Sequence, residues 1–242
     1  MFEQTQINNT TYWHDPLLLP ENVEQAFSIE YWQENKAVTG SAQGRGTTWF
    51  VQGEQGEFAL RHYRRGGLFG KLIKDRYWFT SLEDTRAYQE LKLLRQLIEC
   101  NVNVPAPIAA RITKNGLTYQ ADIIVQRISN ANDLVGLLSQ QVLSKELFKK
   151  VGWEIKKMHD ASVNHTDLNI HNILIDQSNQ AWIIDFDKCK AEEKDNGWKQ
   201  SNLERLKRSF DKEVRLGKIQ LPDYAWPSLE EGYSTRISGN SK

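Results

Sequence analysis

The sequence predicts an α+β fold of two lobes: a small, mainly antiparallel β lobe with one key helix, then a mainly helical lobe. Three observations predict it. Short β-rich runs separated by glycine turns occupy the first half of the chain, amphipathic helical patterns dominate the second, and the polar stretch 129–132 separates them. We therefore expect a β-rich lobe over residues 1–129 and a helical lobe over residues 130–242, together forming one domain.

Composition narrows the class of protein. A chain of 242 residues can bury a substantial core. Lys+Arg and Asp+Glu are balanced at 31 each, so no overall field favours nucleic acid, and an anionic partner would need a local basic cluster. Cys100 and Cys189 lie far apart, which suits a reducing cytosol. The first residues do not resemble a signal peptide, and no apolar run is long enough to span a membrane.

The first lobe begins with a short helix expected over residues 21–33. Gly44 and Gly46 then form a turn before the β-branched, aromatic run 47–51, and residues 58–61 form the partner strand, which ends at Arg61. Glycines let a backbone approach phosphate groups closely. A plain strand turn is the alternative interpretation, because Trp49 stands where a third glycine would complete the usual phosphate-loop pattern.

A basic, glycine-interrupted segment follows between Arg61 and Arg76. It contains several cations and one acid, Asp75, with leucine and phenylalanine interleaved. Such a segment suits an acidic, partly lipidic substrate, and the alternative is an exposed loop without function. The candidate substrate-binding residues are Arg64, Arg65, Lys71 and Lys74.

A helix is expected from Ser81 to Ile98. Ser81 and Asp84 resemble a capping box, and the apolar residues at helical spacing are Ala87, Leu91, Leu94 and Ile98. Glu90 lies at the edge of this stripe, where it could pair with a cation of the sheet. Glu83 is the competing candidate, but it lies too close to the helix start to face a core.

Later elements are an apolar strand over residues 119–126 and two helices over residues 144–160 and 202–216. The inward residues expected in the first helix are Leu147, Val151, Ile155 and Met158, and those in the second are Leu203, Leu206, Phe210 and Val214. Trp226-Pro227 and the tail after Tyr233 are expected to be coil.

The most informative pattern is His165-x-Asp167-x-x-x-x-Asn172, followed by Asp185-Phe186-Asp187. Phosphoryl transfer from ATP needs one carboxylate to orient the attacking hydroxyl and accept its proton. It also needs a second carboxylate and an amide oxygen to hold magnesium on the phosphates. Asp167, Asp185 and Asn172 match these three roles in order and spacing. The alternative is a capping aspartate, a buried histidine and a strand-end turn.

Two short apolar runs support this placement. Residues 173–175 and 181–184 flank the polar turn 176–180, which predicts a β-hairpin. A hairpin would bring Asn172 beside Asp185, so that both candidate magnesium ligands converge.

The order of these elements resembles the protein-kinase-like superfamily over about residues 38–216. More narrowly, the chain is similar to the bacterial 3-deoxy-D-manno-octulosonic acid (Kdo) kinases of lipopolysaccharide core synthesis. The segments that carry this resemblance are 40–48, 60–67, 70–72, 74–77, 165–174 and 185–189. Arg61 in place of the usual lysine, and Asp187 in place of a glycine, depart from protein kinases but are similar to this sugar-kinase family.

The resemblance implies ATP and Mg²⁺ as cofactors and phosphorylation of the 4-hydroxyl of a Kdo residue on a lipid A precursor. It implies that Asp167 is the catalytic base, that Asn172 and Asp185 bind the metal, and that Gly44, Gly46, Arg61 and Glu90 serve the nucleotide. It also implies a lipid-linked Kdo acceptor and peripheral attachment to the anionic cytoplasmic face of the inner membrane. No nucleic acid and no protein partner are predicted.

Three other functions stay open at this point. A kinase of another small molecule, such as an aminoglycoside or a choline-like alcohol, would need an acidic rim, and the Asp167 loop has few spare carboxylates. A protein kinase would need a longer helical lobe. A catalytically silent nucleotide-binding scaffold is suggested by Trp49, Arg61 and Asp187, but a scaffold does not need a base.

Overall fold

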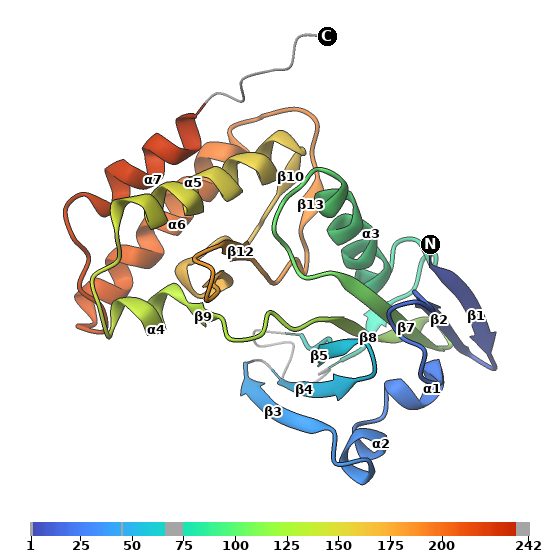
Figure 1. Ribbon diagram of the computed structural model, residues 1–242. Helices are drawn as coiled ribbons and strands as arrows, with labels where there is room; N and C mark the ends of the chain where they lie inside the picture. Colours follow the sequence, from blue (N-terminus) through green and yellow to red (C-terminus); the bar gives the residue numbers. More distant parts are fainter. Residues whose placement is uncertain (1, 45, 66–74, 236–242) are drawn as a thin grey trace, which may run out of the picture. The chain divides into compact units, whose positions relative to one another are not determined.

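The computed structural model describes residues 2–44, 46–65 and 75–235, and Figure 1 shows the order of their helices and strands. The chain divides into two compact units. The first contains Met1–Arg95 and Pro105–Ile128, and the second contains Gln96–Val104 and Ser129–Lys242. This division falls one residue before the expected boundary between 129 and 130, and it assigns residues 96–104 to the second unit. The interpretation of the units as two lobes of one domain stays a prediction.

An antiparallel sheet of eight strands forms the first unit, in the order β1-β2-β7-β8-β5-β4-β3, with β6 paired to β8 (Figure 1). The strands are β1 (Glu3–Ile7), β2 (Thr10–His14), β3 (Val38–Gln43), β4 (Thr47–Gly53), β5 (Gly56–His62), β6 (Tyr77–Trp78), β7 (Pro107–Asn115) and β8 (Thr118–Gln126). The strands expected from the apolar runs 47–51, 58–61 and 119–126 are thus confirmed as β4, β5 and β8. The mainly antiparallel β architecture is confirmed as well.

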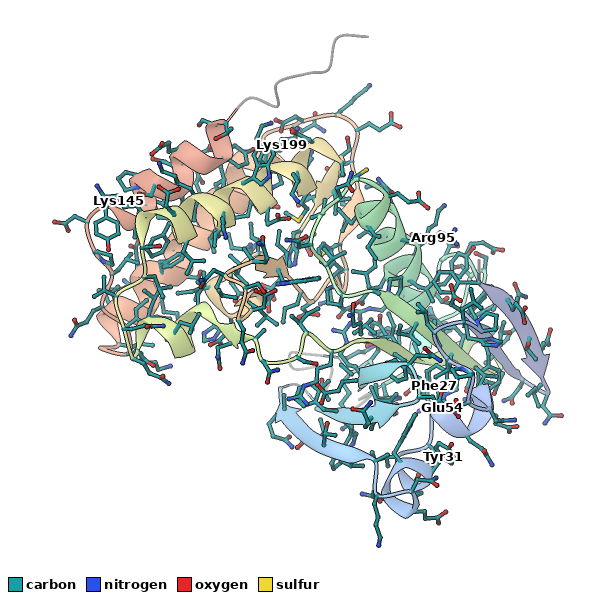
Figure 2. The ribbon with its side chains drawn as sticks, in the orientation of Figure 1. Phe27, Tyr31, Glu54, Arg95, Lys145 and Lys199 are labelled. Carbon is teal, nitrogen blue, oxygen red and sulfur yellow. The ribbon has the colours of Figure 1, made fainter. Side chains whose placement is uncertain are left out.

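Two apolar clusters lie on opposite faces of this sheet, because successive strand residues point to opposite sides. Tyr12 belongs to one cluster and Trp13 to the other. The first cluster packs under the short helices α1 (Val23–Ala26) and α2 (Ile29–Glu34). Figure 2 labels Phe27, which follows α1, and Tyr31, which lies in α2. The second packs under α3 (Arg86–Glu99). In β5, Leu60 faces the first cluster, so Arg61 faces the side of α3.

The single helix expected over residues 21–33 was wrong, because two N-caps divide it. The Asn22 side chain accepts hydrogen bonds from the backbone of Glu24 and Gln25, which starts α1. Ser28 adopts an extended conformation and its hydroxyl accepts from the Tyr31 N–H, which starts α2. A residue in a capping conformation cannot continue the preceding helix, so α1 ends at once.

The helix expected from Ser81 begins later, at Arg86. The Ser81 hydroxyl accepts from the Asp84 N–H at 3.2 Å and also bonds its carboxylate, so the capping-box residues close a turn before the helix. Ala87, Leu91 and Leu94 are buried as expected. Ile98 is 41% exposed, whereas Leu97 is fully buried, so the apolar stripe ends one residue earlier than expected.

Four helices dominate the second unit: α4 (Leu134–Leu138), α5 (Lys145–Asp160), α6 (Trp198–Arg215) and α7 (Ala225–Ser234). Its strands are short: β9 (Asn132–Asp133), β10 (Val163–Asn164), β11 (Ile173–Ile175), β12 (Ala181–Ile183) and β13 (Lys190–Ala191), with a 3₁₀ turn, η2, at Ile170–Asn172. The expected helix over residues 144–160 is confirmed, with Ser144 as its N-cap. In the described part of the chain, no helix is both long and apolar enough to cross a bilayer.

Two expectations for the end of the chain were wrong. Val214 is 41% exposed, and Glu213 takes the buried position on α6 instead. Residues 225–234 form α7 rather than coil. Pro227 is compatible with this helix because it lies in the first turn, where backbone N–H groups have no partner within the helix. Packing of α7 against α5 stabilises it: a Cβ on Gly232 would lie 2.0 Å from the Lys149 carbonyl oxygen, so the two backbones approach very closely.

Candidate active site

The expected hairpin after the His165 loop is confirmed. Strands β11 and β12 pair antiparallel, and the Asp176 carboxylate closes the turn by accepting from the backbone of Ser178 and Gln180. At the open end of the hairpin, the Ile184 N–H donates to the Asn172 carbonyl at 3.0 Å. This bond places the backbone of Asn172 beside the residue that precedes Asp185. Two segments twelve residues apart in sequence therefore meet at one end of the hairpin.

Asn172 is oriented by its own loop. Its Nδ2 donates to the Asp167 carbonyl at 3.0 Å, and the Asn169 side chain donates to the same carbonyl at 2.8 Å. Since the amide nitrogen must face that carbonyl oxygen, the assignment of the two amide atoms is determined by the network. The Oδ1 atom is then directed away from this bond, as a metal ligand requires.

Asp167 is half exposed, with 46% of its side chain accessible. Among the described residues its ion-pair partner is Arg205 of α6, whose Nη1 lies 3.9 Å from Oδ1. A carboxylate that accepts a proton from an acceptor hydroxyl must be reachable by that acceptor, and Asp167 meets this condition.

Asp185 has a left-handed backbone, with φ of 63°, and Lys188 follows with φ of 69°. Aspartate tolerates this region better than most residues, yet it remains a costly conformation that clusters at functional sites. The next residue, Phe186, is buried and its ring centroid lies 4.8 Å from that of His165. The packed phenylalanine therefore anchors a turn that presents Asp185 and Asp187.

His165 connects the two segments. Its Nε2 is 3.0 Å from the Ile184 carbonyl, to which it donates, and its side chain is fully buried. Burial lowers the pKa of His165, so the ring is neutral. Its role is to fix the loop against the strand that leads to Asp185, rather than to transfer a proton.

Side chains on one face of helix α6 bind the backbone of the same loop. The Asn202 Oδ1 accepts from the His165 N–H at 3.1 Å, and the Ser209 hydroxyl accepts from the Ile170 N–H at 2.9 Å. The Glu213 carboxylate lies 3.3 Å from His171 Nε2. Together with Arg205, these residues stand at spacings of three, four and four along α6, which puts them on one side of a helix. None of the four was expected from the sequence, although polar residues at helical spacing beside the apolar stripe were a signal for them.

Arg61 and Glu90 form an ion pair in the first unit. Arg61 Nη2 donates to Glu90 Oε1 at 2.6 Å and to Oε2 at 2.7 Å, and the Tyr63 hydroxyl donates to Oε2 at 2.5 Å. Glu90 is 5% exposed and Arg61 25%. The expected pairing is therefore present, and Glu83 is exposed in the turn before α3. The part of this pair in nucleotide binding stays a prediction.

Gly44 and Gly46 lie in the turn between β3 and β4, where the Gly44 N–H donates to the Gly46 carbonyl at 2.9 Å. A Cβ on Gly46 would lie 2.9 Å from Cδ of Arg64, so a larger residue would require the exposed Arg64 side chain to shift. Contact of this turn with phosphate stays a prediction.

Among the candidate substrate-binding residues, Arg64 is exposed, and Arg65 donates from Nε to the Arg76 carbonyl at 2.7 Å. The Arg65 guanidinium also lies 5.0 Å from the Tyr77 ring centroid. Arg65 thus braces the residues on the far side of the basic segment. Lys71 and Lys74 lie outside the described residues.

The ligand set suits magnesium bound together with a nucleotide. Mg²⁺ is usually held by one or two carboxylates plus substrate phosphates and water, and Asn172 and Asp185 provide one amide oxygen and one carboxylate. Among the described residues no group of three or more His, Cys, Asp or Glu side chains could hold a metal alone. Binding of Mg²⁺ by Asn172 and Asp185 on bound phosphates stays a prediction.

Residues 29–233 match the model of the lipopolysaccharide kinase (Kdo/WaaP) family. The chain is 60% identical over 202 residues to the 3-deoxy-D-manno-octulosonic acid kinase of Vibrio cholerae serotype O1, covering 84% of this chain and 86% of that protein. It is 53% identical to the enzyme of the same name from Vibrio parahaemolyticus, covering 97% of this chain and 98% of the relative.

A solved structure described as WaaP in complex with acyl carrier protein has a similar fold. The TM-score is 0.59, the identity is 16%, and the match covers 91% of this chain and 86% of that one. Together with the family model, it confirms the protein-kinase-like α+β fold class. The catalytic-loop pattern, the match over most of the chain and the extensive identity to named Kdo kinases agree, and this chain belongs to the lipopolysaccharide kinase (Kdo/WaaP) family.

Proposed function

We propose that this protein is an ATP-dependent sugar kinase that phosphorylates the 4-hydroxyl of a Kdo residue on a lipid A precursor. One observation carries the proposal: identity of 53% to a Kdo kinase over 97% of the chain. The geometry supports the same chemistry, because the hairpin brings the Asn172 loop beside the segment that carries Asp185.

In the proposed reaction, Asp167 orients the acceptor hydroxyl and accepts its proton as the oxygen attacks the terminal phosphoryl group of ATP. Asn172 and Asp185 hold Mg²⁺, which neutralises charge on the phosphates as the bond to the leaving group breaks. Arg61, oriented by Glu90 and Tyr63, binds the phosphates as a planar cation. Neutral His165 keeps the loop in place throughout.

The chemistry of the acceptor explains the cluster of basic residues between Arg61 and Arg76. Kdo carries a carboxylate and a lipid A precursor carries phosphates, so its recognition needs cations although the whole chain has no net charge. Arg64, Arg65, Lys71 and Lys74 are the proposed contacts, and peripheral binding to the cytoplasmic face of the inner membrane is part of the proposal. Each basic residue near an anionic surface contributes about 1 kcal/mol.

Protein partners are a separate matter. The acyl carrier protein belongs to the complex of the solved relative, and identity of 16% transfers the fold alone. The absence of a protein partner stays a prediction, and co-elution of this chain with an acyl carrier protein would contradict it.

The direct test is to incubate the protein with ATP, magnesium and a Kdo-lipid A precursor and to follow the mass of the lipid. We expect a gain of one phosphate, which disappears in Asp167→Asn while ATP binding survives, because that carboxylate contacts the acceptor rather than the nucleotide. Aminoglycosides and choline serve as alternative acceptors in the same assay. Phosphorylation of one of them, without reaction of the Kdo lipid, would overturn the proposal.

A further inference from the structure

Arg205 stands beside the proposed base without a strong bond to it. The 3.9 Å between its Nη1 and Asp167 Oδ1 exceeds the 2.7–2.9 Å of a charge-assisted hydrogen bond. Both side chains are half exposed, 50% for Arg205 and 46% for Asp167, and exposed pairs of this kind contribute little to stability. Folding stability therefore does not account for a guanidinium at this position.

The position of Arg205 is nevertheless well determined. Its neighbours on the same face of α6 are Asn202 and Ser209, which accept hydrogen bonds from the catalytic loop on either side of Asp167, at His165 and Ile170. These bonds fix the loop to the helix, so the helix sets the distance between Arg205 and Asp167. Of the α6 residues on this face, Arg205 is the cation, and Asp167 is its ion-pair partner among the described residues.

We propose that Arg205 binds the carboxylate of the acidic sugar whose hydroxyl is deprotonated by Asp167. The inference rests on the proposed function and adds a specificity-determining residue to it. In Kdo a single ring carbon separates the carbon that bears the carboxylate from the carbon that bears the reacting hydroxyl. When that hydroxyl meets Asp167, a guanidinium next to Asp167 is placed to receive the carboxylate, and the planar fork of arginine matches its two oxygens.

A guanidinium near the base could instead stabilise the transferred phosphoryl group. Cations with that task act best in a water-excluded site. The half-exposed Arg205, contributed by a helix outside the loop that carries Asn172, is better suited to a recognition contact at the rim of the site. The two roles differ in their dependence on the acceptor, which gives the test.

The experiment compares two acceptors, a Kdo-lipid A precursor and the same lipid with the Kdo carboxylate converted to its methyl ester. For the unaltered protein, kcat/KM should fall about 10- to 100-fold on the ester, since a hydrogen bond to a charged group is lost. The kcat/KM of Arg205→Met should fall by a similar factor on the acid, and on the ester it should stay close to that of the unaltered protein. The KM for ATP should not change.

Arg208→Met is the matched control. Arg208 lies one turn further along α6, is 67% exposed and pairs with Glu204 at 3.8 Å. The Arg208→Met variant loses the same charge from the same helix, and it should keep the preference for the acceptor with a free carboxylate over its methyl ester. Arg205→Lys should recover part of this preference, because lysine keeps the charge without the fork, and its recovery shows that the variant helix is folded.

Three results would overturn the inference. In the first, Arg205→Met keeps the full kcat/KM on the acid. In the second, its kcat/KM falls by the same factor on the acid and on the ester. In the third, its preference for the acid equals that of Arg208→Met. The second of these, together with an equal loss in ATP hydrolysis without acceptor, would assign Arg205 to the phosphoryl group. Failure of the unaltered protein to phosphorylate the acid is a different outcome, because it removes the proposed function itself.

Discussion

Acid should destabilise the second unit through His159, a histidine of α5 that is 1% exposed. Its Nε2 lies 3.3 Å from Asn202 Oδ1, to which it donates, and its Nδ1 accepts from the Tyr233 hydroxyl at 2.8 Å. Both ring nitrogens are thus bonded in the neutral form. Burial lowers the pKa of His159 to about 4. Burial also raises the pKa of Tyr233 to about 12, so that hydroxyl remains a donor.

The magnitude follows from the two pKa values. In the unfolded chain the histidine has a pKa of 6.5, so between 6.5 and about 4 the unfolded state binds more protons than the folded one. Stability contributed by neutral His159 is therefore fully present above 6.5 and is lost as the pH falls. The loss is about 2 kcal/mol near pH 5 and about 3 kcal/mol once both states are protonated.

The assay is urea unfolding at pH 7.5 and at pH 5, followed by circular dichroism, for the unaltered protein and for His159→Gln. Glutamine stays polar but does not titrate. The unaltered protein should lose about 2 kcal/mol more than the variant over this interval. An equal loss in both proteins would refute the reasoning, because other groups would then account for all of the acid sensitivity.

Three further predictions concern the Arg61–Glu90 ion pair, the packing of α5 against α7 and the candidate metal ligand Asp185. Glu90→Gln should raise the KM for ATP and lower the free energy of unfolding by about 2 kcal/mol, because Arg61 keeps its charge but loses a buried carboxylate partner. Steady-state kinetics measure the first effect and urea unfolding the second, and an unchanged KM would mean that the pair does not serve the nucleotide. Gly152→Ala should lower the free energy of unfolding by about 3 kcal/mol or more, because the new Cβ would lie 2.0 Å from the Leu229 carbonyl oxygen. Thermal unfolding measures the effect, and an unchanged Tm would mean that α7 can move away from α5 at no cost. Asp185→Asn should raise the magnesium concentration needed for half-maximal rate by more than about tenfold, and an identical magnesium titration would place the metal elsewhere.

Several expectations from the sequence depended only on neighbouring residues, and these were confirmed. The hairpin after Asn172 has its turn at Asp176, where a short polar side chain bonds the following backbone. The helix capped by Ser144 begins where expected, because the Ser144 hydroxyl accepts a hydrogen bond from the N–H of Leu147, three residues later. Local chemistry of this kind is visible in a few consecutive residues.

Expectations that depended on helix phase or on distant partners were less accurate. One residue turns a helix by about 100°, so Leu97 replaces Ile98 and Glu213 replaces Val214 at the buried positions. Helix α7 was missed because its stability comes from the close contact of Gly232 with α5, not from its own sequence. In the basic segment, the contacts of Arg65 with the Arg76 carbonyl and the Tyr77 ring were not expected from the sequence, and the part of Arg65 in acceptor binding stays a prediction.

The sequence by itself indicated the chemistry of the protein, because Asp167, Asn172 and Asp185 occur at the spacing of a catalytic loop followed by a hairpin, whose open end joins the backbones at Asn172 and Ile184. It also determined the family, through the residues that surround them. The tertiary structure confirmed the preference for Glu90 over Glu83 as the partner of Arg61, and it alone revealed Arg205 beside Asp167. Those partners lie 29 and 38 residues away in the chain, and such contacts depend on how packed elements are oriented, which no local pattern specifies.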